Sequence, residues 1–291
     1  MCHVPEQGFT VNEMATAVGI EGRSMRRNAP TLYNVAYARR LFHDARETSL
    51  EQQIWGPLLA ASEMGNPSVG YVLERIRTLP DYQGLFETAF DGKGPGMENL
   101  GMALAAYERT LVSANSPFDR WYYGGQQDAL PEAAIRGFRL FSGAAGCSRC
   151  HRLTATHALL TDHALHNTGI GYRASFSDPV ATGIPVAPGN DLGRYEITGD
   201  PADRWKYRTP TLRNVALTAP YMHDGSLGSL QEVVAFYNAG GVVNPNLDPL
   251  LKPLNLSRPE LDDLVAFLMS LTGDNVDVIV GDAFAAPIGD P

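Results

Sequence analysis

Two stretches of the sequence repeat each other at a distance of 180 residues, and this repeat constrains the fold more than any other feature. Pro30–Ala36 and Pro210–Ala216 agree at six of seven positions. A His-Asp pair follows each stretch, at His43 and at His223, and a Ser-Leu pair then follows with equal spacing. One such block could be a decayed low-information repeat, but two blocks in one register indicate two related units. We therefore expect two domains built around the same kind of site.

A five-residue motif in the second unit indicates what that site holds. Cys147 and Cys150 are separated by two residues, and His151 follows directly. In a c-type haem attachment motif, two thiols bind the haem vinyl groups and the His is an iron ligand. A bare C-x-x-C also occurs in zinc sites and redox disulfides, but the adjacent His makes both alternatives weaker. We interpret these three residues as a haem site.

The first unit should carry a matching motif upstream of Pro30. The chain begins Met1-Cys2-His3, which matches the end of a C-x-x-C-H motif. An accidental Cys-His pair is the alternative, and the repeat makes it the weaker one. We expect Cys2 and His3 to serve a second haem. We also expect the missing first cysteine, and a periplasmic signal peptide, to precede residue 1 in the natural protein.

Length and charge bound the organisation. The 291 residues are enough for two domains, which we predict at 1–120 and 121–275, with a tail at 276–291. The stretch 116–127 is the expected connection. A net charge of −9 argues against nucleic acid or an anionic membrane as partner. No run of about 18 apolar residues is present, so we predict no membrane span.

Local patterns favour a mostly helical chain. Apolar spacing and capping signals predict helices at 98–112, from Pro131 towards the haem motif, and after Ser229 and Ser257. Residues 172–205 are rich in Pro, Gly and Asp and are predicted to form a long loop. The tail beyond Thr272 shows little periodicity and should be loose or lie over the other domain.

Taken together, these motifs resemble those of the bacterial di-haem cytochrome c peroxidases, particularly the MauG-type branch. The resemblance rests on the C-x-x-C-H motif, on RTPTLRNVALTAPYMHDGSLGSL at 208–230 and on VVAFYNAGG at 233–241. It implies a mostly α fold with two cytochrome-c-like haem domains joined by a linker and long loops around the haems. It also implies a first haem that reacts with hydrogen peroxide and a second that relays electrons.

The sixth ligand of the second haem distinguishes the branches of this family. The resemblance places Tyr237 at that position, where other members have Met. A phenolate favours higher iron oxidation states and lowers the reduction potential. Two alternatives stay open: Tyr237 is a packing aromatic beside Val233, or Met222 is the ligand.

The resemblance also implies acid–base residues beside the first haem. Glu63 matches the distal carboxylate that assists peroxide cleavage, and Gln53 matches the amide beside it. Breaking the O–O bond moves a proton from the inner to the outer oxygen, which a positioned carboxylate can carry. The alternative is that Glu63 is a surface charge. The 19–27 loop contains no His, so the resemblance further implies a first haem that is open without prior reduction.

Two weaker correspondences concern the region between the haems. Calcium would be bound by the Asn28 side chain and the carbonyls of Thr218 and Pro220, since Ca²⁺ prefers oxygen ligands; a turn Asn is the alternative. His43 stands where the family tends to have Trp and is a candidate for the electron path. An imidazole is harder to oxidise than an indole, which puts that role in doubt.

The expected function is thus a periplasmic, peroxide-dependent di-haem oxidoreductase. Its electrons would come from a small donor protein, a cytochrome c or a cupredoxin, or from an oxidised protein substrate. The alternative from another class is a non-enzymatic electron-transfer cytochrome or redox sensor, which becomes the better interpretation if only one haem is retained.

Overall fold

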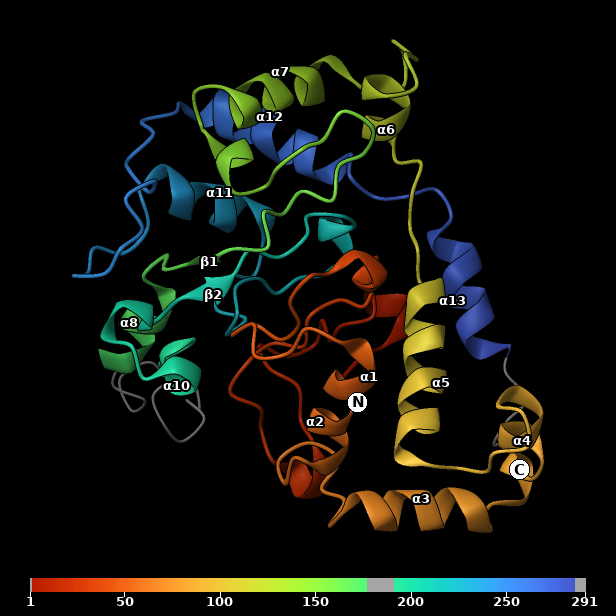
Figure 1. The fold of residues 1–291 in the computed structure, drawn as a ribbon. Helices are drawn as coiled ribbons and strands as arrows, with labels where there is room; N and C mark the ends of the chain where they lie inside the picture. The colour runs from red at the N-terminus through yellow and green to blue at the C-terminus, as the bar shows by residue number, and fades with distance from the viewer. Residues whose placement is uncertain (1, 177–190, 286–291) are drawn as a thin grey trace.

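The computed structural model describes residues 2–176 and 191–285 and shows a mostly helical chain, as predicted. Figure 1 shows helices at the top and bottom of the view and along its right side, with irregular segments in the middle. The first half contains α1 Leu50–Gln53, α2 Trp55–Leu59, α3 Val69–Thr78, α4 Leu85–Ala89 and α5 Met97–Thr110. The second half contains α6 Pro117–Tyr122, α7 Glu132–Ser142, α8 Ile170–Phe176, α10 Tyr195–Thr198, α11 Leu230–Asn238 and α12 Arg258–Met269.

The core of the second half forms where α7 packs along α12 (Figure 1). On α7, Ile135 and Phe141 are buried and face the α12 residue Phe267, which is fully buried. Gly137 permits this close approach, because a Cβ at that position would lie 1.9 Å from the carbonyl oxygen of Asp263. The predicted amphipathic helix is therefore confirmed, and it leads directly into the Cys147 motif.

The predicted connection at 116–127 is more ordered than a linker. It contains α6, which begins with a capping box in which Ser116 and Asp119 bind each other's backbone N–H groups. Phe118 is fully buried in the core of the second half. The sequence predicted only that this stretch connects the two domains, and the structure adds that its aromatic residues give it a face that packs into the core of the second half. The domain boundaries themselves stay a prediction.

The tail is also helical. α13, Val276–Phe284, lies beside α5 of the first half, where Asp282 is close to Tyr107 (Figure 1). Its Ile279 is buried against Phe9 and Tyr33. Of the two alternatives for the tail, its described part, up to residue 285, matches the one in which it lies over the first half.

The predicted long loop at 172–205 falls partly outside the described residues, at 177–190. Its described part contains the end of α8 and the short α10. Beyond it, β2 Tyr207–Arg208 pairs antiparallel with β1 Leu165–His166. None of the helices in the described residues is long and apolar enough to cross a membrane.

The sequence repeat is matched in the backbone. Asn34 and Asn214 occupy equivalent repeat positions, and both adopt the left-handed conformation, with φ of 59° and 56°. An isolated bridge between Leu41 and Glu47 is matched by one between Tyr221 and Leu227, also 180 residues on. The two halves therefore hold the same irregular loop, which neither helix nor strand propensity would predict.

Candidate haem sites

His3 and His151 are held in the same way in the two halves. Nδ1 of His3 lies 2.9 Å from the carbonyl oxygen of Phe9, and Nδ1 of His151 lies 2.8 Å from that of Leu160. A carbonyl oxygen only accepts, so Nδ1 carries the proton and Nε2 keeps its lone pair. Phe9 and Leu160 also share a left-handed backbone, with φ of 54° and 55°. Each imidazole is thus oriented with Nε2 available to a metal, as an iron-ligating His requires.

Threonine side chains brace both acceptor segments. Thr31 donates to the carbonyl oxygen of Gly8 at 2.6 Å, and its repeat partner Thr211 donates to that of Leu159 at 2.7 Å. These bonds connect the repeated Pro-Thr-Leu block to the segment that receives the His bond. The repeated sequence therefore builds the support of each imidazole, which explains why it recurs.

A cavity of about 770 Å³ opens beside Cys2 and His3. Cofactor pockets usually enclose about 300–1,000 Å³ with mostly apolar walls and a few polar groups. Apolar side chains form much of the wall, namely Leu32, Leu41, Leu50, Ile54, Leu58 and Leu104. The predicted residues Gln53, Glu63, Asn28 and His43 line the same cavity. Its size, walls and free imidazole fit a haem.

Glu63 is positioned by the 19–27 loop. The amide N–H of Ile20 donates to the carbonyl oxygen of Glu63 at 2.8 Å, and Arg23 donates to that of Ala61 at 3.0 Å. Gly19 is needed here, because a Cβ would lie 2.0 Å from the carbonyl oxygen of Ser62. Burial raises the pKa of the Glu63 carboxyl, and the charge of Arg46 opposes this only in part. The carboxyl therefore titrates above the range of an exposed Glu.

The cavity has a cationic wall made by four arginines. Arg26, Arg27, Arg46 and Arg208 all line it. Arg27 binds Asp44 and Asp191, each at 2.6 Å. Sequence analysis did not single out these arginines. Their positions along the chain carried no signal, because the fold alone brings Arg208 beside Arg26, Arg27 and Arg46.

In the second half, Cys147 and Cys150 are free thiols beside His151. Burial raises the pKa of the Cys147 thiol to about 11. Tyr237 is near enough for both cysteines to add to the effect of burial in raising the pKa of its phenol. The structure thus brings together four of the predicted residues, namely Cys147, Cys150, His151 and Tyr237. Met222 has a left-handed backbone, with φ of 72°, and does not line the first cavity.

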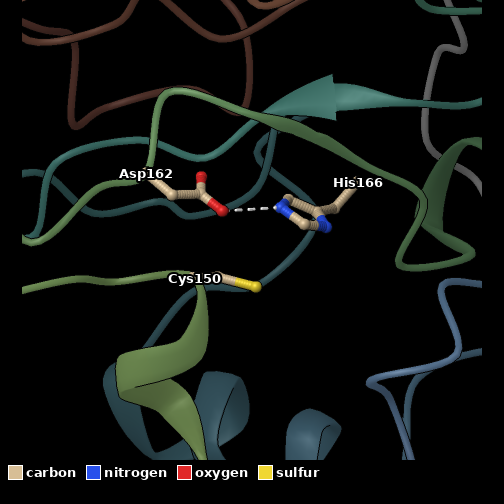
Figure 2. A group of neighbouring side chains, drawn as sticks. All are labelled: Cys150, Asp162 and His166. Atoms are coloured by element: carbon tan, nitrogen blue, oxygen red, sulfur yellow. Dashed lines mark hydrogen bonds and ion pairs between the residues drawn. The ribbon is translucent and has the colours of Figure 1, made fainter.

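His166 lies against Cys150 and between two carboxylates. Figure 2 shows the imidazole facing the Cys150 sulfur, with one nitrogen bound to Asp162. The distances are 3.0 Å from Nε2 to Asp162 and 2.6 Å from Nδ1 to Asp248. Cys150, then Asp248 and Asp162, raise the pKa of His166 to about 10 despite burial. Cys150, Asp162 and His166 form a possible metal-binding group, but both imidazole nitrogens are already engaged by carboxylates.

Two of the three candidate calcium residues, Asn28 of the first half and Pro220 of the second, are in contact. The Asn28 amide nitrogen donates to the carbonyl oxygens of Ala15 at 3.0 Å and Pro220 at 3.1 Å. The amide oxygen of Asn28 accepts from the Thr10 hydroxyl at 3.3 Å. The hydroxyl group of Thr218 donates to the carbonyl oxygen of Val215 at 3.2 Å.

His43 is neutral and fixed. Its Nε2 donates to the carbonyl oxygen of Asn28 at 2.9 Å, and burial lowers its pKa to about 3. Within the second half, the rings of Tyr207 and His223 stack with centroids 3.6 Å apart, and the Arg27 guanidinium of the first half lies 5.7 Å from the centroid of the Tyr207 ring. In the sequence, His223 was visible only as the repeat partner of His43, and Tyr207 carried no recognised motif.

Comparisons with known proteins agree with this geometry. The family model of the di-haem cytochrome c peroxidases matches residues 1–127. The methylamine utilization protein MauG of Methylorubrum extorquens is 38% identical over 94% of this chain and 72% of its own length. Cytochrome-c peroxidase IdrP1 of Denitromonas iodatirespirans is 38% identical over 93% and 75%. The crystal structure of a MauG-like protein associated with microbial copper homeostasis superposes with a TM-score of 0.79, at 31% identity, over 98% of this chain and 86% of that one.

Proposed function

The chain belongs to the di-haem cytochrome c peroxidase family, and we propose that it reduces hydrogen peroxide in the cavity beside His3, using electrons that arrive through the site of His151. One observation supports this assignment most strongly. The two imidazoles share one hydrogen-bond arrangement, and the first lies on a large cavity that also holds an amide and a carboxyl, those of Gln53 and Glu63.

The attachment residues follow from the two motifs. Cys147 and Cys150 form thioether bonds at the second site, and Cys2 forms one at the first. His3 and His151 present Nε2 as iron ligands while Nδ1 stays bound to a backbone carbonyl. When bound, the haems supply the redox chemistry, which is peroxide reduction at one iron and electron exchange at the other.

Glu63 is the proton-transfer residue in this proposal. Reduction of hydrogen peroxide to two waters consumes two electrons and two protons. The carboxylate accepts the proton of the inner peroxide oxygen and returns it to the outer one, which leaves as water. Gln53 donates its amide N–H to the peroxide and so orients it. The raised pKa of Glu63 suits a group that must both accept and return a proton near neutral pH.

Tyr237 is the proposed sixth ligand of the second iron, with Met222 as the rival. Its phenol lies close enough to Cys147 and Cys150 for their charges to affect it, and no hydrogen bond to another described residue engages its hydroxyl. A phenolate ligand would hold the second site at a low potential. This favours a role in which the second site stores an oxidising equivalent.

The remaining assignments rest mainly on the resemblance. We propose Ca²⁺ at Asn28, Thr218 and Pro220, where the Asn28 amide meets the Pro220 carbonyl. His43 lies on the wall of the first cavity and is the proposed point of entry for electrons. The donor is a small cytochrome c or cupredoxin, or an oxidised protein substrate, and the proposed location is the periplasm.

Turnover by the fully haem-loaded protein tests the proposal. Haem per chain is first measured as the pyridine haemochrome, and peroxide consumption is then followed with a reduced small cytochrome as donor. Two haems and steady turnover are expected. A di-haem protein that consumes no peroxide with any reduced donor would contradict the enzymatic role. A single haem per chain, at Cys147 and Cys150, would favour the electron-carrier alternative.

A further inference from the structure

Arg208 is a cation without a carboxylate partner among the described residues. It lies on β2 of the second half but lines the cavity of the first. Its Nε donates to the carbonyl oxygen of Phe42 at 3.3 Å, and one terminal nitrogen donates to that of Thr209 at 3.4 Å. A guanidinium has five N–H donors, so these two weak bonds leave most of its donors unused.

The other arginines of the cavity differ in this respect. Arg26 binds Glu196 at 2.7 Å, and Arg27 binds Asp191 at 2.6 Å. Arg46 shares Asp44 with Arg27, at 2.7 Å. Their charges are thus already compensated by the protein. Arg208 has only neutral carbonyls, and burial alone lowers the pKa of its guanidinium. A charge left uncompensated in this way is costly unless an anion arrives.

The chemistry of the expected cofactor provides such an anion. A haem carries two propionate carboxylates, and a guanidinium binds a carboxylate through two parallel N–H donors. Hydrogen peroxide is neutral, so the substrate does not satisfy this charge. We propose that Arg208 binds a propionate of the first haem, so that the second half of the chain supplies the positive charge for the haem of the first half. This inference rests on the proposed function, because it requires a haem at His3.

The local structure holds Arg208 in place for this role. Its amide N–H donates to the carbonyl oxygen of His43 at 2.7 Å, and it pairs with Leu165 across the β1–β2 ladder. The residue is therefore fixed by both halves. The equivalent position of the first repeat is Asn28, which is uncharged. The repeat thus does not require a charge here, and the positive charge is specific to the second copy.

Loss of this charge should change the reduction potential of one haem. A propionate without its cation stabilises the ferric state, because that state carries the additional positive charge at the iron. In Arg208→Gln we expect the reduction equilibrium of the first haem to shift about tenfold towards ferric, equivalent to about 59 mV for one electron. Arg208→Lys should keep most of the wild-type potential, because it keeps the charge.

Spectroelectrochemical titration of both haems in the full chain tests this. Lys206→Gln serves as the matched control, because Lys206 lies two residues before Arg208, just outside β2, and Asp203 already compensates its charge at 3.2 Å. The titration is repeated between pH 6 and pH 8. In Arg208→Gln the propionate should take up a proton on reduction, so the potential of the first haem becomes more dependent on pH. A purely structural role for Arg208 would not produce this change.

The outcomes separate this inference from the proposed function. An unchanged first-haem potential in a fully loaded Arg208→Gln protein would overturn the inference and leave the peroxidase role intact. A shift confined to the second haem would also overturn it, since the propionate would then belong to the other site. A wild-type chain without a first haem would overturn the proposed function, and this inference with it.

Discussion

Arg213 forms a two-point ion pair with Asp119, with N–O distances of 2.6 and 2.7 Å. The guanidinium is buried, and its Nε also donates to the carbonyl oxygen of Ala158 at 2.6 Å. Arg213 thereby links the repeated Pro-Thr-Leu block to the start of α6, through Asp119. It also links that block to Ala158, two residues before the Leu160 carbonyl that accepts from His151. In the first repeat the equivalent residue is Tyr33, so this link occurs only in the second half.

Replacement of Arg213 by Met should destabilise the protein by up to about 3–5 kcal/mol, because Asp119, whose side chain is only 15% exposed, would be left without its partner. Denaturant unfolding followed by circular dichroism measures the loss. Arg258→Met is the control, since Arg258 pairs with Asp262 on an exposed helix surface and should contribute little. An equal loss in both variants would show that the Arg213 pair contributes no more than a surface contact.

The same pair predicts how stability depends on pH. Burial alone would raise the pKa of Asp119, but Arg213 and Ser116 bring it below its ordinary value. A carboxyl with a lowered folded-state pKa contributes stability that is present above its unfolded pKa, about 3.9, and is lost as pH falls through the folded value. The free energy of unfolding of Asp119→Asn should therefore be lower than that of the wild type at pH 7. It should also fall less than that of the wild type when the pH is lowered. A steeper acid loss in this variant would contradict the prediction.

Much of the fold could be predicted from the sequence where the signal is local. The capping boxes at Ser229 and Ser257 mark helices that are present. α13 was missed because its buried residues are few, with Ile279 alone fully buried. In the first half, periodicity predicted α5, which lines the cavity, whereas the short α1 and α2 beside it carry little periodicity, and there the repeat was more informative.

The candidate site was predictable only in part, for a related reason. His3 and His151 stand in motifs, so their chemistry is visible in the sequence. Arg208 and Tyr207 lie in the second half of the chain and reach the interface through β2 pairing and loop packing. Their sequence neighbours do not show what they face. Residues that act across two halves need the fold before their role can be inferred.

Calcium binding should depend on Asn28. Asn28→Ala removes the only side-chain oxygen of the proposed site, so its affinity for Ca²⁺ should fall, by about tenfold or more if the site behaves as other metal sites do when a supporting group is lost. Calorimetric titration of chelator-treated protein measures this. Asn12→Ala is the control, because its amide donates to the nearby Leu217 carbonyl at 3.1 Å but lies outside the proposed set. Equal Ca²⁺ affinity in both variants would exclude Asn28.

The ligand of the second iron can be identified by two replacements of Tyr237. Tyr237→Met should raise the reduction potential of the second haem and leave the first unchanged, because a thioether stabilises ferrous iron better than a phenolate. Tyr237→Phe should leave the iron with an open position, which the low-temperature EPR spectrum of the ferric protein would report as additional high-spin signal. Met222→Leu is the control. If only this variant changes the second haem, Tyr237 is a packing residue.

Glu63→Gln should lower the turnover of hydrogen peroxide by about 10²–10⁴-fold with both haems retained, because an amide keeps the shape of the side chain but cannot carry the proton. Burial raises the pKa of Glu63, so its base form is lost as pH falls through a value above the ordinary 4.3 or so. The wild-type turnover rate should thus fall as the pH is lowered. The residual turnover rate of the variant should not show this fall. Glu74→Gln, an exposed change on α3, is the control. Full activity of Glu63→Gln would mean that another group moves the proton.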